Sequence, residues 1–322
     1  MQFLEVPAII DTAKKNDFLH VFLINGPVAL ITSKLIIDTY GLDENNVFLS
    51  CTRYTDMKII NSQPFIPNDY WYDRYFEKIL SIRLKSLRIL KEINKKNKNF
   101  IFFCSWAELG SEKIIASKFC KGHIYIEEGQ GSYRNLKPFR YKPQLIIVNI
   151  IQNLYLFIAR KRVLYAIDRQ DIFRDDAQAF IGITSNAFPM VPKEKRYILE
   201  NYTTLKNHYK PKLLGVKTVG LTCADRRIQP PQWKSMLKAL VAKMPEGGVI
   251  KLHPSFCADK KKVDIMKSLL KVINAPDIRI CDDDILIEIE MLYEKKELIG
   301  PLTSLSIYTN AFGSKFEDIK LC

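Results

Sequence analysis

Short apolar runs alternate with longer amphipathic stretches along the chain. The runs are rich in Val, Ile and Phe, which is typical of buried strands. The predicted strands of the first half are 20–24, 47–50, 99–104, 123–127 and 179–184. Helical patterns begin at Pro27 and cover 70–96 and 107–119. Strands that alternate with helices in this way predict a parallel sheet built from βαβ units, and therefore a first doubly wound domain.

The same alternation starts again in the second half. A short helix near 192–202 and a polar connector at 203–212 are predicted to lead into it. The strands predicted there are 217–222, 248–252, 278–281 and 297–300, and the helices are 231–243, 259–272, 284–293 and 303–311. We expect an α/β fold with two Rossmann-like domains, 1–205 and 206–322, that face each other across a cleft. This architecture is common among enzymes that use nucleotide-activated donors.

Composition narrows the class of protein. With 322 residues, of which 47% are hydrophobic and 26% charged, the chain is typical of globular proteins. Its 49 Lys and Arg exceed its 35 Asp and Glu by 14, which predicts attraction to an anionic partner. The seven Cys are an odd number without C-x-x-C spacing, so they indicate neither a disulfide framework nor a zinc ribbon. A cytoplasmic protein without a secretory signal is expected.

The most apolar stretch, LIIVNIIQNLYLFIAR at 145–160, raises the question of a membrane. A spanning helix needs about 20 apolar residues, and this stretch is shorter and contains Asn149, Gln152 and Asn153. We expect a core helix or a homodimer interface. The alternative is a helix that lies on the inner face of the membrane, because Lys161 and Arg162 follow the stretch.

Three predicted strands end in residues that can do chemistry. Their ends read Glu127-Glu128-Gly129, His253-Pro254 and Gly300-Pro301-Leu302-Thr303-Ser304. In open α/β sheets, ligands bind at the carboxyl ends of the strands. Each motif also has an ordinary structural explanation: solvated acids in a loop, a turn histidine and a helix N-cap.

Taken in order, these motifs resemble those of the bacterial sialyltransferases of lipooligosaccharide and capsule synthesis. That family carries Asp/Glu-Asp/Glu-Gly, His-Pro and Ser-Ser/Thr, and EEGQGSY at 127–133 looks most like the lipooligosaccharide branch. The resemblance implies a GT-B type glycosyltransferase that moves sialic acid from CMP-sialic acid to a glycan, such as a terminal galactose. It implies an inverting reaction without a metal. The alternatives are a CMP-Kdo-dependent transferase and a polysialyltransferase.

The chemistry of such a transfer assigns a role to each motif. Glu128 is the first candidate for the general base, Glu127 would orient it, and their proximity would raise the pKa of one carboxyl. Asp225, which follows the strand at 217–222, is a rival base. His253, with Lys251 and Pro254 beside it, would bind or protonate the CMP phosphate.

The resemblance also implies that the first domain, 1–205, binds the acceptor and that the second, 206–322, binds the CMP donor. Glu288, with Glu290 as the fallback, would bind the ribose of CMP, and Gly300, Thr303 and Ser304 would hold its phosphate at a helix N-terminus. The acidic run Asp282-Asp283-Asp284 is predicted to cap a helix and not to bind metal.

A basic chain could instead be a nucleic-acid or membrane-binding protein without activity. The sequence contains no zinc-finger spacing and no RNP-like aromatic motif, which argues against nucleic acid.

Overall fold

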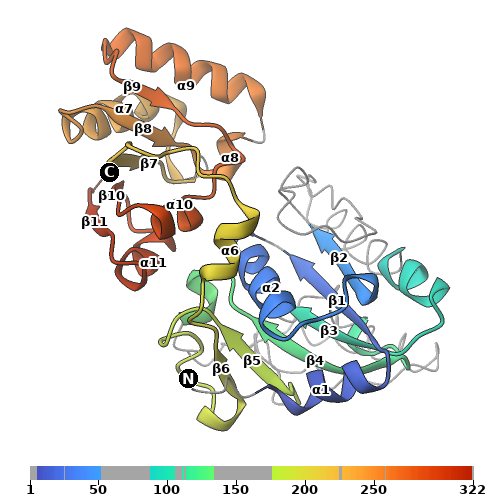
Figure 1. Cartoon of the computed structure of the whole chain (residues 1–322). Helices are drawn as coiled ribbons and strands as arrows, with labels where there is room; N and C mark the ends of the chain where they lie inside the picture. The colour runs from blue at the N-terminus through green and yellow to red at the C-terminus, as the bar shows by residue number, and fades with distance from the viewer. Residues whose placement is uncertain are drawn as a thin grey trace, which may run out of the picture. The chain divides into compact units, whose positions relative to one another are not determined.

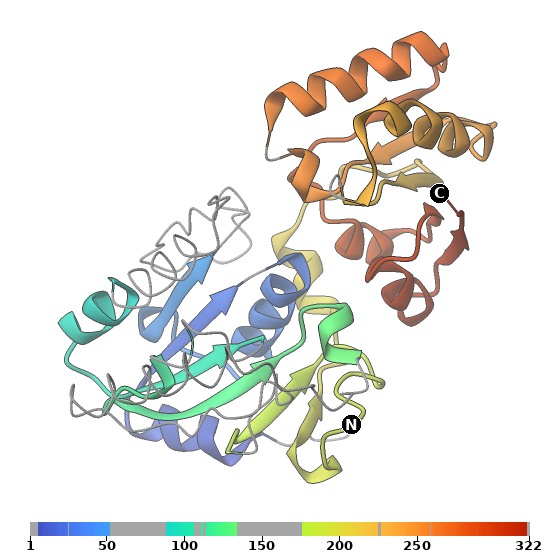
Figure 2. The same cartoon turned by 180° about the vertical axis from the view of Figure 1, so that it is seen from behind.

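The computed structural model describes residues 6–24, 26–51, 88–105, 111, 114–133, 176–224, 227–257 and 259–320. The chain divides into two compact units, Met1–Thr204 and Leu205–Cys322, and each contains its own sheet (Figures 1 and 2). Every strand pair in both sheets is parallel. The predicted α/β class with two Rossmann-like domains of the GT-B type is therefore confirmed. The substrate roles assigned to the two domains, and the cleft, stay predictions.

The first unit is built on a sheet with the order β2-β1-β3-β4-β5-β6. Its strands are β1 (Leu19–Ile24), β2 (Val47–Cys51), β3 (Phe100–Cys104), β4 (Cys120–Ile126), β5 (Ala179–Gly182) and β6 (Arg196–Ile198). The side chains of β1 and β3 are buried along their whole length, which explains why these strands read as continuous apolar runs.

Two helices of the first unit flank this sheet. Helix α1 (Ala8–Lys15) contacts β3, and α2 (Pro27–Thr39) contacts β1 and β4. Helix α2 begins with Pro27 at its first position, which suits the fixed φ of proline. Its residues from Val28 to Ile37 are all buried, including the polar run Thr32-Ser33-Lys34.

The second unit has the sheet order β11-β10-β7-β8-β9. Its strands are β7 (Thr218–Leu221), β8 (Gly248–Lys251), β9 (Ile278–Ile280), β10 (Glu297–Gly300) and β11 (Lys315–Asp318). The helices are α6 (Thr203–His208), which crosses the unit boundary, α7 (Trp233–Ala242), α8 (Pro254–Cys257), α9 (Lys260–Ile273), α10 (Ile287–Tyr293) and α11 (Leu305–Ala311). Helix α7 contacts α9, and α10 contacts α11.

Right-handed crossovers place these two helix pairs on opposite faces of the sheet. The core on one face joins Leu237 and Leu240 of α7 and Met266 and Leu270 of α9 to Ile250 of β8.

Some predicted elements differ from the observed ones. The helix near 192–202 is a short 3-10 turn, Lys193–Lys195, followed by β6, because Arg196 to Ile198 pair with β5. Residues 203–208 of the predicted connector form α6, and α10 begins three residues later than predicted, at Ile287. Helices α1 and α8 and strand β11 were not predicted. The stretch 145–160, most of the predicted helix 70–96 and Asp225 lie outside the described residues.

In the part of the chain that the structure describes, no helix is both long enough and apolar enough to cross a membrane.

Candidate functional site

The strand order of each sheet reverses at one point, and such switch points are where open α/β sheets bind ligands. In the second unit, the reversal lies between β7 and β10. The residues that follow β7, β8 and β10 are Thr222, His253 and the Pro301–Ser304 turn. Three motifs that are far apart in the sequence therefore end at the same edge of one sheet.

His253 is fixed by the residues around it. Its backbone N–H donates to Oγ1 of Thr222 at 2.7 Å, which ties the end of β8 to the end of β7. Its ring Nδ1 accepts the backbone N–H of Ser255 at 3.2 Å and lies 2.9 Å from Oγ of Ser255. Because Nδ1 acts as an acceptor, the neutral ring carries its proton on Nε2. His253 is thus prepared to donate a hydrogen bond from Nε2 to an anion.

The structure gives Lys251 a different position from the one predicted. Its Nζ donates to the backbone oxygens of Asp282 at 3.0 Å and Asp283 at 2.6 Å. The ammonium group therefore holds the connection from β9 to α10 against the end of β8. The role of Lys251 in phosphate binding stays a prediction, and it would require these contacts to break.

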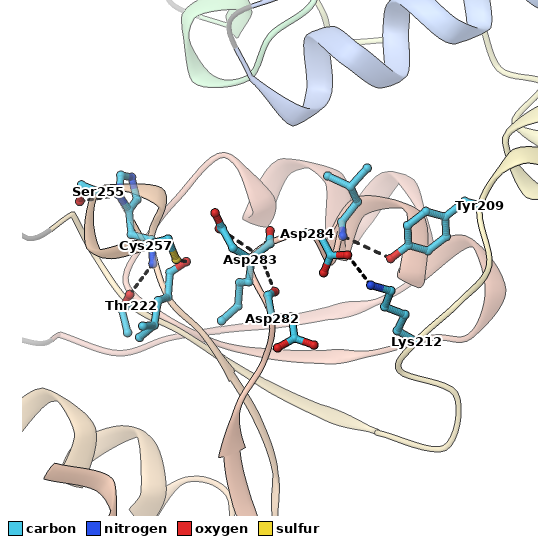
Figure 3. A network of polar contacts seen from close by, with 12 residues as sticks. Tyr209, Lys212, Thr222, Ser255, Cys257, Asp282, Asp283 and Asp284 are labelled. Atoms are coloured by element: carbon cyan, nitrogen blue, oxygen red, sulfur yellow. Dashed lines mark hydrogen bonds and ion pairs between the residues drawn. The ribbon is translucent and has the colours of Figure 1, made fainter. Parts of the chain in front are cut away.

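The acidic run lies before α10 and does not cap it. The helix begins at Ile287, its N-cap is Leu286, and no side chain caps it. Asp284 instead forms an ion pair with Lys212. Figure 3 shows this network, with Tyr209, Lys212 and Asp284 at one end, Thr222, Ser255 and Cys257 at the other, and Asp282 and Asp283 between them. The expected capping role is wrong because the helix starts after the acids.

Glu288 lies in the first turn of α10 and is 7% exposed. Burial raises its pKa, whereas a hydrogen bond to its own backbone and the charge of Lys251 oppose this shift. No other residue in the described part of the chain donates a hydrogen bond to its carboxylate. A buried carboxylate without compensating donors is costly, so Glu288 is the best candidate in this unit for a group that accepts hydrogen bonds from a ligand.

Glu290, the fallback for the same role, is fully used by the fold. Its carboxylate accepts the hydroxyl of Tyr209 at 2.7 Å and the backbone N–H groups of Lys212 and Leu213 at 2.8 and 3.0 Å. The Tyr209 hydroxyl also accepts the N–H of Leu286 at 3.3 Å. Glu290 therefore fastens the chain after α6 to α10.

The two hydroxyl residues before α11, Thr303 and Ser304, differ in their hydrogen bonds. Oγ1 of Thr303 accepts the N–H of Leu305 at 3.2 Å, whereas Ser304, the N-cap residue, makes no side-chain capping bond. Gly300 serves packing, because a Cβ there would lie 2.6 Å from the backbone oxygen of Leu221. Only glycine lets β10 approach β7 this closely at the switch point.

In the first unit, the motif EEGQGSY forms a loop that is bonded to the chain after β5. Glu127 is fully buried, and its carboxylate accepts the hydroxyl of Tyr133 and the N–H groups of Ile183 and Thr184, the latter two at 2.7 and 3.3 Å. Gly129 has a φ of 137°, which favours glycine. This motif therefore has a structural purpose that is independent of any substrate.

The side chain of Glu128 lies in different surroundings from that of Glu127. Its backbone N–H donates to Oγ of Ser132 at 3.2 Å, and its side chain lies beside Gly26, the N-cap of α2. A Cβ on Gly26 would lie 3.9 Å from Oε1 of Glu128. The helix dipole favours an anion at this position. The role of Glu128 as a base stays a prediction.

Three site residues were not found from the sequence. Thr222 and Ser255 position His253, and Tyr209 positions Glu290. Ser255 stands two residues after His253, a spacing at which serine often bonds to a neighbouring turn residue, and this signal could have identified it. Thr222 and Tyr209 contact residues 31 and 81 positions away, so sequence gives no sign of them.

Among the residues described, no group of three or more His, Cys, Asp or Glu side chains could hold a metal ion.

Comparisons with known proteins find solved structures of similar fold. No protein-family model and no curated protein sequence matches the chain. Among solved structures, S. aureus MnaA with UDP has a TM-score of 0.56 at 12% identity, covering 94% of this chain and 79% of that one. The UDP-N-acetylglucosamine 2-epimerase from Rickettsia bellii has a TM-score of 0.52 at 13% identity, with the same coverage. UDP-GlcNAc 2-epimerase from Neisseria meningitidis bound to UDP-GlcNAc has a TM-score of 0.52 at 10% identity, covering 94% and 83%.

These similarities correct the expected family and function. These three solved structures are a complex of MnaA with UDP and two UDP-GlcNAc 2-epimerases, not sialyltransferases that use CMP-sialic acid. The predicted sialyltransferase activity is therefore wrong, and the CMP-Kdo and polysialic acid alternatives rested on the same resemblance. The error arose because the motifs are short: the acidic pair and its glycine are explained by the fold of the loop that contains Glu127.

Proposed function

We propose that the chain is an enzyme that acts on a UDP-sugar and holds the nucleotide in its second unit, at the carboxyl ends of β7, β8 and β10. The observation that carries this proposal is Glu288, a buried carboxylate whose described surroundings supply no donor besides its own backbone. Ribose hydroxyls are donors of the kind that a glutamate binds in other nucleotide-binding α/β folds.

The diphosphate would lie between His253 and the turn before α11. We propose that its donors are the Nε2–H of His253 and the hydroxyl of Ser304. Both lie at the edge of the sheet where ligands bind. We propose that activity needs no metal, and we expect it to persist in EDTA.

Two features favour conversion of the sugar itself. Two of the solved structures with the same fold are 2-epimerases of UDP-GlcNAc. Glu128, at the start of α2, is a carboxylate that could move a proton in the first unit. We therefore propose epimerisation of a UDP-N-acetylhexosamine as the reaction, with transfer to an acceptor as the outcome that the assay below would reveal instead.

Binding is the first test. Calorimetric titrations with UDP, UDP-GlcNAc and CMP should show binding of both uridine ligands and at least about tenfold weaker binding of CMP. His253→Ala should weaken UDP binding about tenfold, whereas His208→Ala, an exposed histidine in α6, should leave it unchanged. Equal affinity for CMP and UDP, or no binding of either, would contradict the proposal.

The reaction is tested by proton NMR of UDP-GlcNAc incubated with the enzyme. Epimerisation inverts the configuration at C2. It should therefore yield a second UDP-sugar with a changed coupling constant for the proton at C2, and no free UDP. Release of UDP only when a glycan acceptor is present would identify a transferase.

A further inference from the structure

We propose that one face of the second unit, formed by α7 and α9, binds the surface of an anionic membrane. The face consists of six exposed lysines, Lys234, Lys238, Lys260, Lys261, Lys267 and Lys271. We call it the lysine face. It does not depend on the proposed function, because it lies on helices and not at the carboxyl ends of the strands.

The charge on this face is one-sided. Helix α7 contains no acidic residue, and α9 contains Asp264 alone. In the described part of the chain, none of the six lysines forms an ion pair with a carboxylate. Solvated helices usually interleave both signs at i,i+4 spacing, so a run of uncompensated lysines predicts an anionic partner.

The two helices carry these lysines on their outer sides because their other sides are packed. Trp233 and Met236 of α7 and Met266 and Leu270 of α9 are buried in the core of the second unit. Helices α7 and α9 contact each other (Figure 1). The lysines are therefore held on a rigid surface and not on a loose tail.

Aliphatic side chains are exposed on α9 as well, on a different side of the helix from Lys260, Lys267 and Lys271. Ile265 is 46% exposed and Val272 is 66% exposed, and partly buried Leu269 lies between them on α9. Their i, i+4, i+7 spacing puts them in one strip along the helix, and Lys261 stands one turn before it. Helices that lie in a membrane interface combine an apolar strip with a basic side in this way.

This chemistry favours lipid over nucleic acid. Neither α7 nor α9 contains an arginine, and the only aromatic side chain in these helices, Trp233, is buried. Nucleic-acid surfaces rely on arginine forks and on exposed aromatic rings that stack on bases. Lysine attracts diffuse negative charge, and each lysine near an anionic leaflet contributes about 1 kcal/mol. Ile265 and Val272 would add the second signal that stable membrane binding requires.

The test is co-sedimentation of the full chain, without nucleotide, with two kinds of vesicle. We expect binding to phosphatidylcholine mixed with phosphatidylglycerol and none to phosphatidylcholine alone, with loss of binding at about 0.5 M NaCl. The triple variant Lys261→Gln, Lys267→Gln, Lys271→Gln should bind roughly a hundredfold more weakly, at ~1 kcal/mol per lysine.

A matched triple variant tests whether vesicle binding depends on this face or only on the net charge of the chain. Lys210, Lys217 and Lys295 are exposed, lie outside α7 and α9, and lose the same charge when changed to Gln. We expect them to weaken binding by no more than about threefold, because these residues do not belong to the proposed contact surface. Equal losses in the two triple variants would overturn the proposal.

The aliphatic strip is tested by Ile265→Ser with Val272→Ser. These exposed positions tolerate the change, and we expect vesicle binding to fall about tenfold or more. Vesicle binding that is unaffected by this double variant, together with tighter binding to duplex DNA than to vesicles, would identify a nucleic-acid surface and overturn the membrane assignment.

Discussion

Each unit buries glutamates near the carboxyl end of its sheet, but their surroundings differ. Glu127 of the first unit is fully buried, and three donors satisfy it: the Tyr133 hydroxyl and two backbone N–H groups. Glu288 of the second unit is almost as buried, yet its only described hydrogen bond is to its own backbone. Burial is common to both residues, so the supply of donors is what distinguishes a residue that holds the fold from one that awaits a ligand.

The largest effect is expected for Glu127→Ala. The substitution leaves the N–H groups of Ile183 and Thr184 and the hydroxyl of Tyr133 without their acceptor in a buried site. We expect a loss of about 3–5 kcal/mol in the free energy of unfolding, measured by urea denaturation. Glu127→Gln retains one acceptor oxygen and should lose less. An alanine variant as stable as the wild type would show that these donors find other acceptors.

The opposite is expected for Glu288→Gln. The variant should bind UDP about 10- to 100-fold more weakly by calorimetry, because a charged acceptor of ribose hydroxyls is replaced by a neutral one. Its stability at pH 7 should equal or exceed that of the wild type, since ionised Glu288 has no donor besides its own N–H. Weaker UDP binding together with a clear loss of stability would mean that Glu288 holds the fold as Glu127 does.

The effect of Glu288 on the stability of the fold should depend on pH. Burial raises the pKa of Glu288 in the folded state above its ordinary value of 4.5. The folded protein then holds a proton that the unfolded chain has released, so this residue costs stability as the pH rises above 4.5. The advantage of Glu288→Gln should therefore be greater at pH 7 than at pH 4.

Sequence predicted the fold well and the site only in part. The strands at 20–24, 248–252 and 297–300 were found because their apolar runs are continuous and flanked by helical patterns. The motifs at the strand ends were located correctly as well. The purpose of each acid could not be predicted, because Glu127 and Glu290 are defined by donors that are 56 and 77 residues away in the chain.

Elements that depend on tertiary pairing were also missed. Strand β6 is three half-buried residues that extend because they pair with β5, and their sequence, RYI, has no strand pattern of its own. The same holds for β11, whose residues pair with β10. Pairing across the sheet overrides local propensity at such edges.

His20 extends the comparison, because it is a buried polar group that does not lie at the carboxyl end of a strand. It lies near the start of β1, and neither ring nitrogen has a hydrogen-bond partner in the described residues. Burial lowers its pKa from 6.5 to about 4. Between these values the unfolded chain binds the proton and the folded one does not, so stability falls as the pH drops from 6.5 to 4.

At pH 5 this linkage should cost about 2 kcal/mol relative to pH 7. His20→Leu should remove that part of the acid sensitivity in urea titrations, whereas His208→Leu, at an exposed position, should not. Acid sensitivity that is unchanged in His20→Leu would place the responsible protons on other groups. A buried polar group that lacks hydrogen-bond partners thus affects stability wherever it lies. It indicates a site only when it lies near the carboxyl ends of the strands.

The smallest effect is expected for Ser255→Ala, which tests how His253 is prepared. The variant removes the hydroxyl at 2.9 Å from Nδ1 but keeps the backbone N–H at 3.2 Å. We expect a loss of about 1 kcal/mol, or about fivefold, in UDP affinity. The ring nitrogen shifts of His253 in ¹⁵N NMR should move towards a mixture of tautomers, a change that a purely structural role would not produce. If neither affinity nor spectrum changes, the backbone N–H alone fixes the proton on Nε2, and the serine hydroxyl is dispensable at this site.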